Sequence, residues 1–264
     1  MPRSTLSVAI ITLNEEDNLA RTLNSVRFAD EIVVVDSGST DRTVEIARSL
    51  GARVFSESWK GFALQKNSAI DKCTGTWVLS LDADEELTGD LQAEIGKMLE
   101  ADSQLPQVDG YRLRLRHVFL GRWMRYGGYY PDLKLRLFRR VTRSGPAHFT
   151  DRPVHESVAV AGRVETMKND FLHHGYPNLE IYLEHMNRYS TLGARIIADK
   201  GKTSRSWPAF FWNVSLVPKL TFVWNYLFRL GFLDGREGLL LHLYHSAYIS
   251  WKYAKAWQIG RLKD

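Results

Sequence analysis

Two carboxylates, two residues apart, follow an apolar segment of the chain. Asp82 and Asp84 come directly after residues 76–81, so one turn can direct both side chains to the same point beyond a strand. Hard divalent cations such as Mg²⁺ and Mn²⁺ prefer oxygen ligands and commonly share them with substrate phosphates. The pair therefore indicates a site for a metal-bound diphosphate. The alternative interpretation is an acidic first turn of the helix that is expected to begin near Thr88.

A further carboxylate, Asp36, ends the apolar segment 31–36. It could accept a hydrogen bond from a ribose hydroxyl or a base N–H, as the acidic residue of dinucleotide-binding folds does; a turn residue is the alternative. An NAD-type fold is disfavoured because the turn at residues 12–16 lacks the Gly-x-Gly-x-x-Gly pattern. The sequence has no P-loop pattern either, which leaves a nucleotidyltransferase without support.

His155 and Glu156 lie side by side in the segment 152–157. Glu156 could act as a general base, and His155 could tune it or pair with a phosphate. Adjacent residues of a strand face opposite ways, so we expect only one of the two to serve a site; a surface dipeptide is the alternative. His173 and His174 are a weak metal signal by themselves, because they need further ligands from distant parts of the sequence.

The elements that must position these residues alternate over the first hundred residues. Apolar, β-branched segments predict strands at 6–13, 31–36, 53–55 and 76–81, and the segments between them predict helices from residue 19, at 41–50 and at 62–71. This order predicts a parallel sheet with helices on both faces. Ligands of such sheets bind beyond the carboxyl ends of the strands, which is where Asp36, Asp82 and Asp84 lie.

Two later segments, 111–116 and 133–138, alternate apolar and basic residues. Each predicts a strand with one buried face and one cationic face, added antiparallel to the sheet. Arginine binds phosphate bidentately, so Arg136 and Arg139 could hold an anionic sugar or a lipid headgroup. A solvated cationic sheet face is the alternative.

The composition is that of a globular protein, with 264 residues, 44% hydrophobic and 25% charged residues, and a net charge of +5. The charge is unevenly distributed, at −7 over residues 1–100, +8 over 101–206 and +4 over 207–264. The acidic first part argues against a uniform nucleic-acid-binding surface, so no nucleic acid partner is expected. The single cysteine, Cys73, excludes an intramolecular disulfide framework and favours a reducing, cytoplasmic setting.

Five of the eight tryptophans fall in the last 58 residues. A helix is expected at 179–199, and the tail that follows is helical in pattern with interruptions at Pro218 and Gly231. The tail offers no clean run of about 20 apolar residues, so a transmembrane helix is not expected. Aromatic residues flanked by Lys and Arg suit an anionic membrane surface; packing of these aromatic side chains as core is the alternative.

Several motifs occur together in the order and spacing of one family. In the first half these are Val-Ala-Ile-Ile-Thr-Leu-Asn-Glu-Glu, Val-Val-Val-Asp-Ser-Gly-Ser-Thr-Asp, Gln-Lys-Asn and Leu-Ser-Leu-Asp-Ala-Asp-Glu, at 8–16, 33–41, 65–67 and 79–85. The chain thereby resembles the family 2 glycosyltransferases with a GT-A fold. Later segments are similar to the branch that builds the lipopolysaccharide inner core, at 131–140, 154–156, 173–176 and 231–235.

The resemblance implies an α/β fold of the GT-A type, with a Rossmann-like mixed sheet, helices on both of its faces and a C-terminal, aromatic-rich helical extension. Residues 1–205 would form the catalytic domain, with a nucleotide-sugar half at 1–100 and an acceptor half at 101–205. Residues 206–264 would form a membrane-associating extension.

The resemblance also implies roles for particular residues. The nucleotide would be held by Thr12, Asn14, Glu16, Asp36, Lys66 and Asp82. Asp84 would ligate Mg²⁺ or Mn²⁺ directly, together with His173 or His174. Glu156 is the expected catalytic base, and Asp132 is the second candidate.

The implied reaction is inverting transfer of a sugar, glucose from UDP-glucose in the leading case, to a lipid-linked saccharide such as the core heptose. The enzyme would work at the cytoplasmic face of the inner membrane. Another cell-envelope glycan or a polyprenyl-phosphate is an alternative acceptor. A non-catalytic module that binds nucleotide sugars or glycans is the alternative of a different class.

Overall fold

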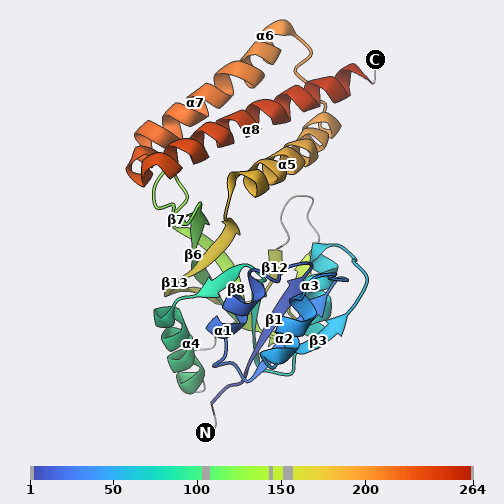
Figure 1. Ribbon diagram of the computed structural model, residues 1–264, viewed down its shortest axis with the longest axis vertical. Coiled ribbons are helices and arrows are strands. Elements are labelled where there is room, and N and C mark those ends of the chain that lie inside the picture. The colour runs from blue at the N-terminus through green and yellow to red at the C-terminus, as the bar shows by residue number, and fades with distance from the viewer. Residues whose placement is uncertain (1–2, 103–107, 143–144, 151–156, 263–264) are drawn as a thin grey trace. The chain divides into compact units, whose positions relative to one another are not determined.

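The computed structural model describes residues 3–102, 108–142, 145–150 and 157–262. The chain divides into two compact units (Figure 1): the first comprises Met1–Arg116 and Asp132–His174, and the second comprises His117–Pro131 and Gly175–Asp264. The segment 179–199, which the sequence grouped with the catalytic domain, thus falls in the second unit. The functional division at residues 205 and 206 stays a prediction.

A mixed sheet forms the first unit. The expected parallel strands are present as β1 (Leu6–Thr12), β2 (Glu31–Asp36), β3 (Arg53–Ser56) and β4 (Trp77–Asp82). Later strands extend the sheet beyond β4: β5 (Glu85–Leu87), β6 (Gly110–Phe119), β8 (Asp132–Arg139) and β13 (Val164–Tyr176). Their order is β3-β2-β1-β4-β8-β6-β13-β5, with antiparallel pairing at β4–β8, β8–β6 and β13–β5. The predicted α/β class and the two antiparallel additions are confirmed.

Strand β1 is buried along its whole length because both faces of the sheet are covered. Val8 and Ile10 belong to one apolar cluster with helices α1 (Leu19–Ser25), α2 (Thr43–Ser49) and α4 (Gly89–Ala101). Ala9 and Ile11 belong to another, with helix α3 (Phe62–Asp71) and the paired strands β11 (His148–Thr150) and β12 (Ser157–Ala159). Two-sided burial is the state that a continuous β-branched, apolar segment predicts.

Helices make up most of the second unit as described. Helix α5 (Leu179–Asp199) has the expected bounds, and the Asn178 side chain caps it by accepting the Ile181 N–H. Helix α8 (Gly235–Arg261) packs along α5. The two helices share an apolar cluster that includes Tyr182 of α5, Leu241 of α8 and Phe119 at the end of β6. The unit also holds the two-residue strand β7 (Arg122–Trp123), paired with the end of β6.

The expected interruption at Pro218 is wrong. The chain stays helical from Trp207 to Phe228, through α6 (Trp207–Phe211), the π-helical turn η1 (Trp212–Leu216), α7 (Val217–Val223) and a second π-helical turn, η2 (Trp224–Phe228). Proline removes the hydrogen bond to the carbonyl four residues earlier and clashes with it. Here that carbonyl, of Val214, accepts the Ser250 hydroxyl of α8 at 2.8 Å instead. The expected break at Gly231 is confirmed, since a short 3₁₀ turn, η3 (Gly231–Asp234), follows there.

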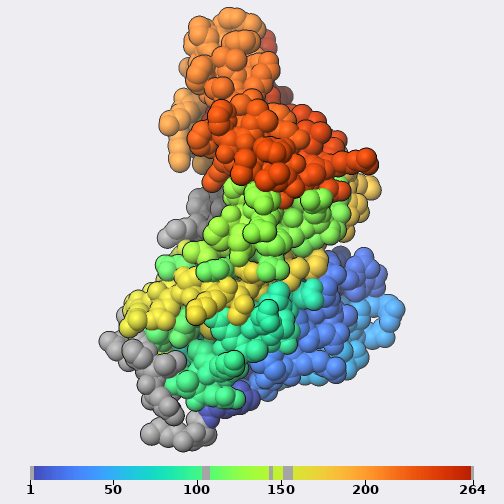
Figure 2. Space-filling view, turned by 90° about the vertical axis from the view of Figure 1, so that its left-hand side faces the viewer, coloured from blue at the N-terminus to red at the C-terminus, as the bar shows by residue number. Residues whose placement is uncertain are grey.

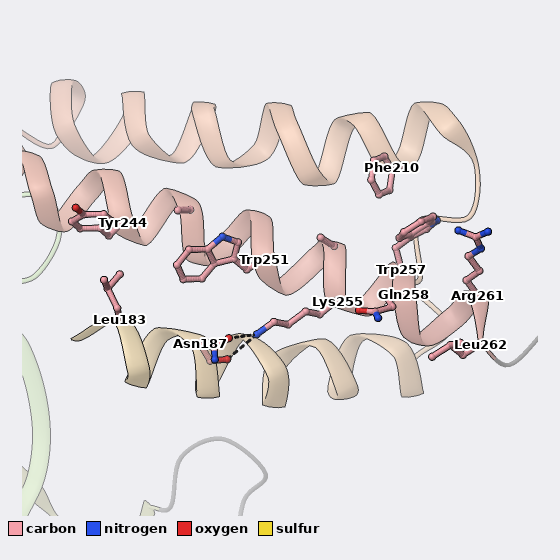
Figure 3. A pocket seen from close by; sticks show the side chains of 12 residues that line it. Leu183, Asn187, Phe210, Tyr244, Trp251, Lys255, Trp257, Gln258, Arg261 and Leu262 are labelled. Atoms are coloured by element: carbon pink, nitrogen blue, oxygen red, sulfur yellow. Dashed lines mark hydrogen bonds between the residues drawn. The ribbon is translucent and has the colours of Figure 1, made fainter. Parts of the chain in front are cut away.

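A groove of about 1220 Å³ lies between α5, α6 and α8 in the second unit (Figure 3). Aromatic side chains line much of it, among them Tyr244, Trp251 and Trp257. At its floor, the Lys255 ammonium donates to the carbonyl and side-chain oxygens of Asn187, at 3.0 and 2.6 Å. Within the part of the chain that the structure describes, no helix has both the length and the apolar character needed to cross a bilayer.

Candidate active site

Asp36 ends β2 and shapes the loop that follows it. Its buried carboxylate accepts the backbone N–H groups of Gly38 and Ser39, both at 3.0 Å, and the Ser39 hydroxyl at 2.5 Å. Thr12 lies beside Asp36 in the β1–β2 register, and its buried hydroxyl has no hydrogen-bond partner among the described residues. These two predicted nucleotide residues therefore meet at the carboxyl edge of the sheet.

Asn14 and Glu16 join the loop after β1 to the loop after β2. Asn14 has a left-handed backbone, with φ of +54°, and its side-chain oxygen accepts the Thr40 N–H at 2.8 Å. The Asn14 N–H donates to the Ser39 hydroxyl at 2.8 Å, and Glu16 accepts the Arg42 N–H at 3.1 Å. The side chains predicted to hold a nucleotide thus also fix the two loops against each other.

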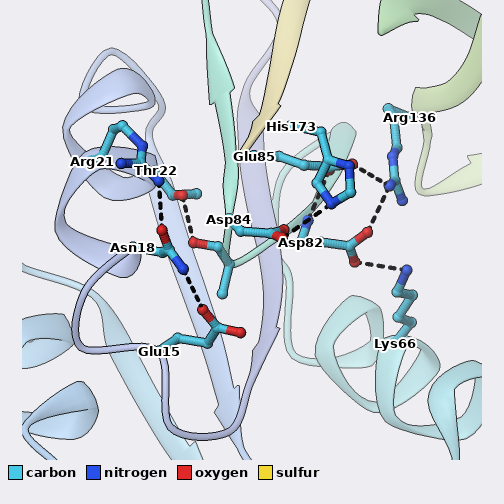
Figure 4. Close-up of polar contacts among 11 residues, drawn as sticks. Glu15, Asn18, Arg21, Thr22, Lys66, Asp82, Asp84, Glu85, Arg136 and His173 are labelled. Carbon is cyan, nitrogen blue, oxygen red and sulfur yellow. Dashed lines mark hydrogen bonds and ion pairs between the residues drawn. The ribbon is translucent and has the colours of Figure 1, made fainter. Parts of the chain in front are cut away.

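Asp82, at the end of β4, lies at the centre of an ion-pair cluster (Figure 4). Its Oδ1 is 2.8 Å from Nζ of Lys66 on α3, and its Oδ2 is 2.7 Å from Nη2 of Arg136 on β8. The same Arg136 nitrogen lies 2.5 Å from Oε1 of Glu85, whose other oxygen accepts the Asp82 N–H at 2.9 Å. Four elements, α3, β4, β5 and β8, thereby bring two cations and two carboxylates together, and we call these four residues the Asp82 cluster.

Burial and charge set the protonation of the two carboxylates in the Asp82 cluster. Burial opposes ionisation of Asp82, but Arg136 and Lys66 outweigh it and hold the pKa of Asp82 well below its usual range. Burial raises the pKa of Glu85 to about 7, because Arg136 offsets the desolvation only in part and the charge of Asp82 adds to it. Asp82 is therefore anionic at neutral pH, whereas Glu85 titrates there.

Asp84 and His173 form a second pair beside the Asp82 cluster, in Figure 4. Asp84 Oδ2 is 3.0 Å from Nε2 of His173 on β13, whereas His174 lies 2.9 Å from Glu86. Burial lowers the pKa of His173, but Asp84 more than compensates and raises it to about 9. Of the two histidines that the sequence left open, His173 is the one whose imidazole pairs with the Asp84 carboxylate, whereas only the backbone N–H of His174 contacts Asp84, at its carbonyl.

The donor set of Asp84 and His173 fits a divalent cation that shares its ligands with a substrate. A carboxylate oxygen and an imidazole nitrogen that has released its proton are both ligands of Mn²⁺, and Mg²⁺ commonly takes one or two carboxylates plus phosphate oxygens. The described residues contain no group of three or more His, Cys, Asp or Glu side chains placed to hold a metal. A cation here would therefore take further ligands from the donor diphosphate or from water.

Glu15 is an acidic residue near Asp84 and Asp82 that the sequence reasoning passed over, since it selected the neighbouring Glu16. The Glu15 carboxylate accepts the Asn18 amide at 2.9 Å. Burial raises the pKa of Glu15, and the nearby carboxylates of Asp84 and Asp82 contribute to the rise. The signal was the pair of adjacent acids in the turn after β1, but a turn pattern does not tell which of the two faces the strand ends.

Arg139 does not join the Asp82 cluster. It pairs in register with Trp77, the first residue of β4, and so lies at the opposite end of that strand from Asp82. Its guanidinium donates to Asp102 at 2.6 Å and to the Val108 carbonyl at 2.9 Å, and it lies 4.6 Å from the Trp77 ring centre. These contacts fix the amino end of β4 to its neighbours.

Of the two candidate bases, only Asp132 lies within the described residues. Asp132 begins β8, which runs antiparallel to β4, so Asp132 lies toward the sheet edge at which β4 ends. Its Oδ2 is 3.1 Å from Lys134 Nζ. Glu156 and its neighbour His155 lie outside the described residues. The identity of the base stays a prediction.

Comparisons with known proteins identify the family of the chain. Residues 7–158, more than half of the chain, match glycosyl transferase family 2. The whole chain is 31% identical to the lipopolysaccharide core biosynthesis glycosyltransferase LpsC of Rhizobium meliloti (strain 1021), over 96% of that protein.

Two solved structures are also similar. TarS of S. aureus in complex with UDP aligns over 98% of this chain and 92% of that chain, at 16% identity and a TM-score of 0.48. Glucosyl-3-phosphoglycerate synthase from Mycobacterium tuberculosis, in complex with Mn²⁺, UDP and glucosyl-3-phosphoglycerate, aligns over 43% of this chain and 44% of that chain, at 26% identity and a TM-score of 0.36. From its family match and its full-length relative, the chain belongs to glycosyl transferase family 2 and is a glycosyltransferase.

Proposed function

We propose that this enzyme transfers glucose from UDP-glucose to a lipid-linked saccharide, such as the heptose of a lipopolysaccharide inner core, with inversion at the anomeric carbon. The observation that carries the proposal is the pair of Asp84 and His173, 3.0 Å apart beside the Asp82 cluster. The full-length similarity to a lipopolysaccharide core glycosyltransferase supports the acceptor class.

Donor binding uses the carboxyl edge of the sheet. The joined loops that contain Asn14 and Asp36 receive the nucleoside, and Lys66 and Arg136 supply positive charge for the diphosphate. Asp84 and His173 would hold Mg²⁺ or Mn²⁺. That cation, when bound, supplies further positive charge that stabilises the leaving diphosphate.

The transfer step needs a base on the acceptor side. The acceptor hydroxyl oxygen forms a bond to the anomeric carbon while the bond from that carbon to the diphosphate oxygen breaks. The diphosphate leaves with the electron pair, stabilised by Lys66 and Arg136, and the Glu156 carboxylate takes the hydroxyl proton. Asp132 is the second candidate for that proton.

A pair of isosteric variants tests the assignment of the base. Glu156→Gln should abolish transfer while UDP-glucose binding survives, because the amide retains the shape but takes no proton. Asp132→Asn is the matched variant and should retain transfer. Sugar transfer and donor binding by calorimetry are the two measurements; full turnover by Glu156→Gln would remove Glu156 from the role, and loss of turnover in Asp132→Asn alone would assign it to Asp132.

The donor and the cation are tested together with a panel of nucleotide sugars, each with Mg²⁺, Mn²⁺ or a chelator. Transfer should require UDP-glucose and a divalent cation, and Asp84→Asn should lose the cation dependence of UDP binding. Transfer at full rate in the chelator would contradict the metal site. A protein that binds the sugar nucleotide yet never releases UDP would instead be the non-catalytic module.

A further inference from the structure

The helical segment from Trp207 to Phe228 exposes a row of large apolar side chains. Trp207 and Phe228 are 74% and 69% exposed, and Trp212 and Trp224 are more than half exposed. We call this row the exposed stripe; it comprises Trp207, Phe211, Trp212, Leu220, Val223, Trp224, Leu227 and Phe228. Side chains of this size are seldom left in water in such a continuous group.

The exposed stripe is straight because the helix that carries it is not uniform. Its members recur at a spacing of four residues. Trp207 is followed by Phe211, Leu220 by Trp224 and Phe228, and Val223 by Leu227. In a regular α-helix that spacing rotates a row by about 40° a turn, so the row would wind around the helix. The π-helical turns η1 and η2 each add backbone to a turn and cancel this rotation.

The opposite face of the same segment is covered by α8. The Ser246 hydroxyl donates to the Pro218 carbonyl and the Ser250 hydroxyl to the Val214 carbonyl, both at 2.8 Å. Figure 1 shows α6 and α7 running beside α8, and in Figure 2 the orange surface of this segment is open beside the red surface of α8. The aromatic side chains of the exposed stripe are thus not core, which was the alternative for this tail.

The charged residues in the sequence around the exposed stripe indicate the chemistry of its partner. From residue 200 to residue 233 the chain has five basic residues and no acidic one; the basic residues are Lys200, Lys202, Arg205, Lys219 and Arg229. An anionic lipid surface complements this charge, and Trp, Phe and Leu suit the headgroup boundary. A second copy of the chain complements it less well, because like charges would face each other across a symmetric contact.

We propose that the exposed stripe lies in the headgroup region of an anionic bilayer, with the helix from Trp207 to Phe228 parallel to the membrane plane. Lys219, exposed within the stripe, reaches the headgroups with its ammonium while its methylenes lie among the apolar side chains. The inference concerns the second unit alone and does not depend on the donor, the acceptor or the transfer step.

Vesicle binding by the full chain tests this proposal. The protein should co-sediment with vesicles of phosphatidylcholine and phosphatidylglycerol far more than with phosphatidylcholine alone, and high salt should release it. The double variant Trp224→Ser/Phe228→Ser should lose binding by about tenfold or more, because it removes two aromatic side chains that would enter the headgroup region. Lys219→Glu should weaken binding to the anionic vesicles only.

A matched control comes from the first unit. Trp59 and Phe62 are 50% and 58% exposed and lie 4.8 Å apart, so Trp59→Ser/Phe62→Ser removes a comparable exposed pair. This control should bind vesicles as the parent does, and unchanged thermal midpoints would show that both variants are folded. Equal vesicle binding by the parent and by Trp224→Ser/Phe228→Ser would overturn the proposal. It would also be overturned if neither protein bound vesicles and the parent formed a dimer that this variant could not form.

Discussion

At the scale of single residues, two cations compensate the carboxylates of the Asp82 cluster, of which Glu85 is buried and Asp82 has a side chain that is 37% exposed. Arg136 contacts both Asp82 and Glu85, and its side chain is only 11% exposed. Removing one member of a buried charge group leaves the others uncompensated, which costs more than the group contributes when complete. The same cations are those proposed for the diphosphate, so stability and donor binding depend on shared atoms.

Arg136→Leu should therefore destabilise the chain by about 3–5 kcal/mol and weaken UDP binding. Arg112→Leu is the matched change, since Arg112 is an exposed arginine on the neighbouring strand β6, and it should stay within about 0.5 kcal/mol of the parent. Urea unfolding and calorimetric UDP binding give the two numbers. Equal stability of the two variants would mean that the Asp82 cluster does not stabilise the fold.

His242 is another buried titratable residue. It is 2% exposed and packs near the rings of Tyr129 and Tyr226. Neither of its ring nitrogens has a hydrogen-bond partner among the described residues. Burial lowers the pKa of His242 from 6.5 to about 4, and it lowers the pKa of the neighbouring His245 to about 4 as well. Burial therefore favours the neutral form of both rings in the folded chain.

The acid dependence of stability follows with a definite sign. As the pH falls below 6.5 the unfolded chain takes up a proton on His242 while the folded chain resists it until about pH 4, so stability falls across this window. The loss from His242 should reach up to about 3 kcal/mol. In His242→Leu, urea unfolding from neutral pH down to about pH 4 should show a shallower loss than in the parent; parallel curves for the two proteins would rule His242 out as a source of acid sensitivity.

At the scale of elements, close backbone contacts decide where helices can pack. A Cβ on Gly238, in the first turns of α8, would lie 2.4 Å from the Gly231 carbonyl oxygen and 2.7 Å from Cβ of Asp234. Gly96, inside α4, has no atom within 4 Å of the equivalent point. Both glycines lower helix propensity, but only Gly238 is required by a neighbour.

The same substitution should thus have opposite effects at the two glycines. Gly238→Ala should destabilise the chain by about 1–3 kcal/mol, because η3 must move away from α8. Gly96→Ala should stabilise it by about 0.5–1 kcal/mol, because alanine favours the helix. Thermal unfolding of both variants measures the difference, and stabilisation by Gly238→Ala would show that the contact with η3 yields without cost.

At the scale of the whole molecule, the uneven charge corresponds to separate tasks. The segment 1–100, which has a net negative charge, contributes Asp36, Asp82 and Asp84 to the sheet edge. The segment 200–233, which has a net positive charge, contains the exposed stripe. All the residues proposed for the donor belong to the first unit, and the stripe belongs to the second. The net charge of +5 describes neither region.

This separation predicts that donor binding and vesicle binding can be removed independently. Saturating UDP with Mn²⁺ should stabilise the parent by about 3 kcal/mol at a hundred times the dissociation constant, and raise the melting temperature by several degrees. Trp224→Ser/Phe228→Ser should keep that shift in full, whereas Asp84→Asn should lose most of it and still bind anionic vesicles. Loss of the UDP shift in the stripe variant would contradict the separation.

The sequence by itself determined the local elements and the family. Strands β2 and β4 and helices α3 and α5 lie where the pattern predicted them, to within a residue, because apolar period and β-branching act through neighbouring residues. The motifs around Asp36, Asp82 and Asp84 likewise need no distant contact to be read, and they led to the correct family.

Only the tertiary structure decided how distant segments meet. The antiparallel pairing of β5 with β13 places the His173 imidazole beside the Asp84 carboxylate, whereas the His174 imidazole pairs with Glu86. Strand direction carries Arg139 to the opposite end of β4 from Asp82, although Arg139 follows Arg136 by only three residues in the sequence. Pro218 does not end its helix, and Ser250, on α8, donates to the Val214 carbonyl to which proline has no N–H to donate. Each outcome depends on a partner that lies far away in the sequence, which no local pattern contains.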